Sequence, residues 1–111
     1  MRAISFALTT QQILNRTKTV TRRIGWGNAT PGQLLCACTK ARGVRVADRE
    51  ILATIRVVSM RKERLDAITP DDVAREGFPG KTPAEFVEMF CKHMKCAPDR
   101  IITRLEFVYE D

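Results

Sequence analysis

A strongly cationic segment near the N-terminus, residues 13–23, limits what this chain can fold into more than any other feature. It holds four Lys or Arg side chains, three threonines and one asparagine within eleven positions. Buried ammonium and guanidinium groups need partners, so the segment cannot be a plain core strand. It lies between an apolar N-terminal run and a Gly-Trp-Gly turn, unlike a solvated tail. We therefore expect the fold to present these side chains to an anionic or hydrogen-bonding ligand.

Length and charge narrow the class of protein. The chain has 111 residues, enough for one core and too few for two, so residues 1–111 are expected to form a single domain. The formal net charge is +6, and Asp48 is the lone acid before Glu50, so the positive excess lies in the first half. A basic balance favours polyanionic partners, nucleic acid first.

The sequence shows neither a membrane span nor a signal peptide. No run approaches the ~18 apolar residues of a spanning helix, and residues 1–8 lack the apolar length and cleavage site of a signal peptide. We therefore expect a cytoplasmic protein with no membrane partner, and reduced thiols at its four cysteines.

Local patterns predict a mixture of short strands and helices. Apolar residues alternate at Ile4, Phe6 and Leu8, which is typical of a strand, while Thr69-Pro70 and Thr82-Pro83 are helix start signals. Strands are expected over residues 3–8, 17–23, 33–39, 50–60 and 101–109, and helices over 10–16, between Thr69 and Gly77, and over 83–95.

This order of elements indicates an α+β fold with a mostly antiparallel sheet, because strands and helices do not alternate regularly. In a domain of this size, a small β-barrel with short flanking helices would hide the sheet edges. The apolar stripe of the last helix, Phe86, Met89 and Phe90, is interpreted as core.

Four motifs, in order, resemble the ASCH domain, a relative of the PUA RNA-binding fold. Lys18, Thr19, Thr21 and Arg23 fall on the Lys, Thr, Thr and Arg of its signature, Gly-Arg-Lys-Thr-x-Thr-x-Arg. Arg16 and Thr17 stand where that signature has Gly-Arg. The remaining matches are the Pro-Gly turn before the 33–39 strand, the Glu-Gly-Phe element at residues 76–78, and the closing strand.

The resemblance implies a PUA-like barrel with a cleft lined by the Lys/Thr segment. Members are linked to RNA binding, RNA cleavage and hydrolysis of the acetyl amide of N4-acetylcytidine. In the amidohydrolase branch the working residues fall on Lys18, Thr21 and Glu76 here. Thr21 would be the nucleophile, Lys18 its activator, and Glu76 the proton donor or relay. Residues three apart on a regular strand face opposite sides, so Lys18 and Thr21 converge only if the strand starts irregularly.

Further cationic and aromatic residues are candidates for nucleic-acid contact. Arg22 and Arg23 can fork onto phosphates, and four further cations extend the positive surface, namely Lys40, Arg42, Arg45 and Arg49, although such a loop is as often plain solvated surface. Trp26 either stacks on a base or plugs one end of the barrel. Thr19 belongs to the matched signature and is included as a ligand contact.

The sequence predicts no metal and no cofactor. His93 and Cys96 have workable spacing on a helix, but Cys91 and Cys96 are five residues apart and diverge, and no Cys-x-x-Cys pair occurs. No glycine-rich phosphate loop is present.

Four functions stay open. The leading one is recognition of RNA or a modified nucleoside. The alternatives are an amidohydrolase acting on N4-acetylcytidine, a metal-independent ribonuclease that uses Lys18 and Glu76 as its acid–base pair, and a protein-interaction module whose cleft has no ligand.

Overall fold

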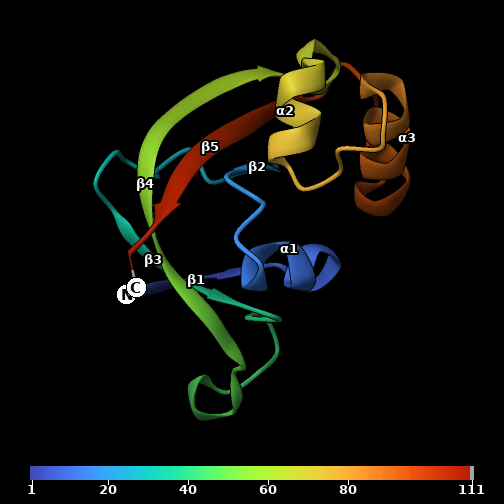
Figure 1. Ribbon diagram of the computed structural model, residues 1–111. Helices are drawn as coiled ribbons and strands as arrows, with labels where there is room; N and C mark the ends of the chain where they lie inside the picture. The colour runs from blue at the N-terminus through green and yellow to red at the C-terminus, as the bar shows by residue number, and fades with distance from the viewer. Residues whose placement is uncertain (111) are drawn as a thin grey trace.

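A curled five-stranded sheet organises the molecule in the computed structural model, which describes residues 1–110 (Figure 1). The strand order is β1-β3-β4-β5-β2. Only the β1–β3 pair is parallel, and the other three pairs are antiparallel, so the predicted α+β class with a mostly antiparallel sheet is confirmed. The strands are β1 (Arg2–Ser5), β2 (Val20–Arg23), β3 (Leu34–Cys38), β4 (Ile51–Arg64) and β5 (Ile101–Tyr109).

The sheet curls into a half-barrel and does not close completely. Register shifts interrupt the β4–β5 pairing between Val57 and Ser59 and the β3–β4 pairing at Ala37, and such bulges bend a sheet. The edge strands β1 and β2 have only four residues each and do not pair with one another. Residues of both edge strands, among them Ser5 and Arg23, line the cavity of the candidate site.

Short helices cover the sheet. They are α1 (Thr10–Leu14), α2 (Pro70–Arg75) and α3 (Pro83–Met94), with single 3₁₀ turns η1 (Ala7–Thr9), η2 (Val46–Asp48) and η3 (Leu65–Ala67). Figure 1 shows α2 and α3 together at one end of the curved β4–β5 ribbon.

The predicted helix start signals are confirmed. The Thr69 hydroxyl accepts a hydrogen bond from the Asp72 amide at 3.2 Å, while Thr82 and Glu85 form a reciprocal capping box. These caps fix where α2 and α3 begin, and α2 carries the acidic side of the candidate site.

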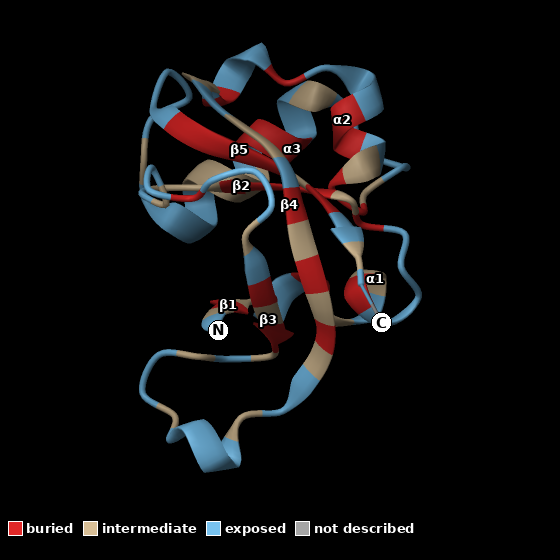
Figure 2. Ribbon diagram, turned by 90° about the vertical axis from the view of Figure 1, so that its left-hand side faces the viewer, coloured by how far each residue is buried: buried red, intermediate tan, exposed pale blue. Residues whose placement is uncertain are grey.

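Two hydrophobic clusters lie on opposite faces of β5. Leu105 and Phe107 belong to the cluster inside the half-barrel, whereas Ile102 belongs to the cluster under α2 and α3. In Figure 2, β5 is buried along most of its length, while β4 alternates between buried and less buried positions. By itself, the apolar alternation over residues 101–109 indicates only one inward face for β5. The helices cover the second face, and the alternation alone does not reveal that.

Three strand boundaries differ by more than one residue from the sequence-based expectation. The first strand stops at Ser5 because the chain turns into η1, and the segment expected from residue 17 pairs only from Val20. Strand β4 continues to Arg64 because the whole of β5 pairs with residues 55–64 of β4. No helix within residues 1–110 is long and apolar enough to cross a membrane.

Candidate functional site

The junction between α1 and β2 aims the side chains of the cationic segment. Helix α1 ends at Leu14, and the amide of Lys18 then donates to the carbonyl of Gln12 at 3.2 Å. Regular strand pairing begins only at Val20. Because Lys18 precedes the regular strand, Lys18 and Thr21 line the same cavity although they are three residues apart. The irregular start that this convergence requires is therefore present.

Arg16 takes a backbone conformation that glycine adopts easily, at the position where the ASCH signature has glycine. Its φ is +62°, in the left-handed region, which costs a non-glycine residue roughly 1–2 kcal/mol. Its guanidinium carbon lies 5.1 Å from the Tyr109 ring centroid, a cation–π contact that offsets part of this cost. The turn before Lys18 thus forms without the glycine.

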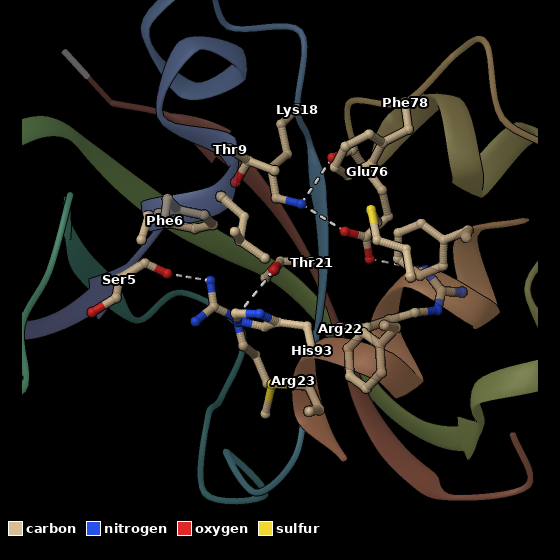
Figure 3. Close-up of a pocket in the computed structure, with 16 residues that line it drawn as sticks. Ser5, Phe6, Thr9, Lys18, Thr21, Arg22, Arg23, Glu76, Phe78 and His93 are labelled. Carbon is tan, nitrogen blue, oxygen red and sulfur yellow. Dashed lines mark hydrogen bonds and ion pairs between the residues drawn. The ribbon is translucent and has the colours of Figure 1, made fainter. Parts of the chain in front are cut away.

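The ammonium group of Lys18 is buried against Glu76 (Figure 3). Its Nζ donates to the carboxylate Oε1 of Glu76 at 2.6 Å and to the Glu76 carbonyl at 2.9 Å. Burial lowers the pKa of Lys18, the attraction of Glu76 opposes this, and the charges of Arg23 and Arg22 lower the pKa further. The cavity therefore contains a strong hydrogen-bond donor that loses its proton more readily than an ordinary lysine.

Arg22 connects this pair to a second buried carboxylate. Its Nη1 lies 3.4 Å from Glu76 Oε2, and its Nη2 donates to Asp72 at 2.7 Å and to Glu63 at 3.0 Å. Arg104 adds two hydrogen bonds to Asp72, at 2.7 and 3.0 Å, and these bonds, with those of Arg22, hold the pKa of Asp72 well below its usual value. The Arg22 side chain is 1% exposed. This geometry favours a positioning role for Arg22 over the phosphate contact expected from the sequence.

Arg23 spans the gap between the two edge strands. Its Nη2 donates to the Ser5 carbonyl at 2.5 Å, and its Nε donates to Thr21 Oγ1 at 3.2 Å. Burial lowers the pKa of Arg23 to about 10, so the group stays charged at neutral pH. Within residues 1–110 no acceptor takes the Thr21 hydroxyl proton. That hydroxyl can therefore donate to a ligand.

These side chains meet in a cavity of about 230 Å³ (Figure 3). Lys18, Thr21, Arg23 and Glu76 supply polar groups, and the apolar lining is rich in aromatic rings. Phe86 is buried, as expected of a core residue, but Met89 and Phe90 are only half-buried and line the cavity. The interpretation of the stripe as core is therefore confirmed for Phe86, while Met89 and Phe90 pack against the same core cluster and are also partly open to the cavity. The apolar lining includes Phe6, Phe78, Phe86, Met89, Phe90 and Met94.

Trp26 and Arg42 lie at a second, neighbouring cavity of about 640 Å³. Arg23 lines both cavities. The guanidinium carbon of Arg2 lies 3.6 Å from the Trp26 ring centroid, and the ring also packs against the core of the half-barrel. One part of the Trp26 ring is thus already covered by Arg2, and the residue both contributes to packing and lines a cavity.

Thr19 and Lys40 line neither cavity. The Thr19 amide donates to the Arg75 carbonyl at 2.8 Å, and its hydroxyl accepts from Arg75 Nε at 3.2 Å, which ties β2 to α2. Lys40 is exposed in the connection after β3. These contacts indicate that Thr19 fastens the segment and does not touch a ligand in either cavity.

Sequence reasoning missed the acidic partners of Arg22 and the source of the aromatic lining. Asp72 resembled an ordinary acid in the first turn of a helix. The available signal was Arg104, a cationic residue in the mostly apolar strand β5, because a buried cation requires a partner. Phe6, Phe78 and Phe90 come from three separate segments, so no local pattern predicts that they meet.

Within residues 1–110 no group of three or more His, Cys, Asp or Glu side chains is arranged to hold a metal ion. The four cysteines are free thiols. His93 lies near the end of α3 and lines the first cavity.

The fold has counterparts among solved structures. A crystal structure of an ASCH domain from Lactobacillus crispatus JV V101 matches with a TM-score of 0.69 and 17% identity, covering 97% of this chain and 78% of the other. A protein from Enterococcus faecalis V583, described with the family name DUF984, matches with a TM-score of 0.70 and 15% identity, covering 100% and 77%. The hypothetical protein PH0355 matches with a TM-score of 0.64 and 12% identity, covering 98% and 96%.

These likenesses establish the fold. The chain has the ASCH-domain, PUA-like fold, as its four sequence motifs indicated. No family model matches the sequence, and no curated protein matches it.

Proposed function

We propose that the protein binds an unpaired RNA base, or a nucleoside, in the cavity lined by Lys18, Thr21, Arg23 and Glu76. The observation that carries the proposal is a buried, hydrogen-bonded Lys–Glu pair that opens onto an aromatic-lined cavity. A pocket that is mostly apolar, with a few convergent polar groups, is the usual form of a small-molecule site.

The chemistry of the lining suits a nucleobase. Aromatic rings such as Phe90 and Phe78 offer faces for base stacking, while Lys18, Thr21 and Glu76 offer donors and acceptors for the edge of a base. The volume, about 230 Å³, lies below the ~300–1,000 Å³ of sites for drug-sized ligands, which favours a single base or nucleoside. The resemblance to ASCH domains, members of which are linked to RNA binding, supports the same ligand class.

Fluorescence anisotropy with short labelled single-stranded RNAs tests this proposal. Stacking on one aromatic side chain contributes ~1–3 kcal/mol, so Phe90→Ala is expected to weaken binding about 5- to 150-fold. Leu14→Ala is the matched control, since Leu14 is 51% exposed and lines neither cavity. Equal affinities of wild type and Phe90→Ala for every RNA would refute binding in this cavity.

A second candidate is hydrolysis of N4-acetylcytidine to cytidine and acetate. It is favoured by the convergence of Lys18, Thr21 and Glu76 in one cavity, and by the burial that lowers the pKa of Lys18. In this proposal Thr21 Oγ1 attacks the acetyl carbonyl and Lys18, in its neutral form, accepts the hydroxyl proton. Glu76 relays a proton to the departing amine nitrogen, and water then releases acetate from Thr21.

Hydrolysis would also require Lys18 to hydrogen-bond Thr21, which it does not do in this structure. Lys18 Nζ donates to Glu76 in the structure, and within residues 1–110 it forms no hydrogen bond with Thr21. Hydrolysis therefore requires Lys18 to lose its proton and turn from Glu76 toward Thr21 when substrate binds.

A chromatographic assay of N4-acetylcytidine turnover separates binding from hydrolysis. Cytidine formation that disappears in both Lys18→Ala and Thr21→Val would support the amidohydrolase. Binding without turnover would leave recognition as the function. If RNA is cleaved without metal, and cleavage needs Lys18 and Glu76 but not Thr21, the ribonuclease alternative is correct.

A further inference from the structure

The second cavity is lined by four arginines and, among the described residues, by no carboxylate. Arg2 and Arg23 come from β1 and β2, while Arg42 and Arg49 come from the connection between β3 and β4. None of the salt bridges found between residues 1–110 involves any of the four. Four guanidinium groups around one cavity repel each other, and an anion between them would remove that repulsion.

Three of the four arginines have contacts that position them and still have unused donors, whereas Arg42 is exposed. Arg2 stacks on Trp26, an arrangement that leaves the N–H edge of a guanidinium free to bind an anion. Arg49 donates through Nη2 to the Ala41 carbonyl at 3.3 Å, while its buried Nε has no hydrogen-bond partner. The Ala41 amide in turn donates to Ser5 Oγ at 2.7 Å, which attaches this connection to β1.

The two cavities share a wall. Ser5, Arg23 and Met94 line both of them, and the Arg23 guanidinium reaches from Thr21 in the first cavity to the Ser5 carbonyl. A group held in the second cavity therefore lies next to a base held in the first. In a nucleotide, the phosphate likewise lies near its base, separated from it by one sugar ring.

We propose that the second cavity is a phosphate subsite, in which Arg42 and Arg49, assisted by Arg2 and Arg23, bind the phosphate attached to the nucleoside in the first cavity. This inference rests on the proposed function and narrows it. The ligand is a nucleotide unit, either a free nucleotide or one residue of an RNA strand, and a nucleoside without phosphate is the weaker ligand. Arginine is suited to this role because its planar fork binds two phosphate oxygens at once.

The test compares ligands that differ only in phosphate. Isothermal titration calorimetry gives the affinities of the four ribonucleosides, their 5′- and 3′-monophosphates, and the matching dinucleoside monophosphates. For the nucleoside that binds, the monophosphate of one isomer is expected to bind at least tenfold more tightly. A still tighter dinucleoside monophosphate would identify an RNA strand as the source of the phosphate, and equal binding would identify a free nucleotide.

Substitutions of single arginines test whether the gain in affinity from the phosphate arises in the second cavity. The ratio of monophosphate to nucleoside affinity is expected to fall at least fivefold in Arg42→Gln and in Arg49→Gln. Arg45→Gln is the matched control, because Arg45 lies in the same connection, is 85% exposed, pairs with Asp48 and lines neither cavity. If the monophosphates bind no more tightly than the nucleosides, or Arg45→Gln lowers the ratio as much as Arg42→Gln, the subsite is refuted.

A titration with inorganic phosphate tests the phosphate subsite separately from the nucleoside site. If no nucleoside or nucleotide binds, the proposed function fails, and inorganic phosphate is titrated while the amide resonances are followed by NMR. Shifts at Arg42 and Arg49 that disappear in Arg42→Gln would still support an anion site in the second cavity. The absence of shifts there would overturn the subsite as well.

Discussion

Replacing Glu76 by Gln should destabilise the fold by about 3 kcal/mol at pH 7. The substitution keeps the shape of the side chain and removes the charge that faces Lys18 at 2.6 Å and Arg22 at 3.4 Å. Lys18 retains its hydrogen bond to the carbonyl of residue 76, but its buried charge loses its counterion.

The magnitude follows from the burial of both partners. The side chains of Lys18 and Glu76 are 3% and 4% exposed, and breaking such a buried pair typically costs about 3–5 kcal/mol, because one charge is left uncompensated. Gln still offers a neutral acceptor, so the lower end of that range applies. For a domain with a typical total stability of about 5–15 kcal/mol, the variant should fold and unfold at clearly lower denaturant concentration.

Urea unfolding followed by the fluorescence of Trp26, the single tryptophan, measures the effect. Asp48→Asn is the control, because its ion pair with Arg45 is exposed and such pairs contribute at most about 1 kcal/mol. In the double variant Lys18→Met/Glu76→Gln, the loss should be smaller than the sum of the two single losses, since neither charge remains unpaired.

Two results would refute this reasoning. A loss below about 1 kcal/mol in Glu76→Gln, equal to that of the exposed control, would show that the buried pair is not formed in solution. Strictly additive losses in the double variant would show that Lys18 and Glu76 do not interact.

Two further predictions concern the surroundings of this pair. The arginines lower the pKa of Asp72 from its usual 3.8, so its stabilising contribution is present above that pH and is lost as the pH falls through the folded-state pKa. The stability difference between wild type and Asp72→Asn, measured by urea unfolding, should therefore be largest near pH 7 and shrink below pH 3.8; a difference independent of pH would contradict this. Gly77→Ala should cost at least about 1 kcal/mol in thermal or urea unfolding, because φ is +100° and an added Cβ would lie 2.7 Å from Gln12 Cγ. Gly80→Ala is the control, because no atom lies within 4 Å of a Cβ added there, and its stability should equal that of wild type. Equal stability losses at the two positions would contradict the geometry.

The parts of the fold that could be predicted are those set by local chemistry. The caps at Thr69 and Thr82 determine where two helices start, and period-two alternation determines most of β4 and β5. The three motif residues Lys18, Thr21 and Glu76 do meet, because the chain before Val20 is irregular.

The remaining features depend on contacts between distant segments. The ion pairs of Arg22 and Arg104 with Asp72 join β2, β5 and α2, and no spacing rule connects these residues in sequence. Similarly, Phe90 looks like core on a helical wheel, and only the tertiary arrangement leaves it half-buried beside a cavity. The sequence places Arg49 in a positive surface, but its position in a cavity, with a buried and unpartnered Nε, depends on the tertiary arrangement.

The central claim is that a base binds in the first cavity, and an NMR titration tests it most directly. Isotope-labelled protein would be titrated with the four ribonucleosides and N4-acetylcytidine while the backbone amides are followed. The account predicts that at least one ligand shifts the resonances of Lys18, Thr21, Glu76 and Phe90, with Leu14 unaffected. Shifts confined to other surfaces, or no shifts with any of these ligands, would contradict it.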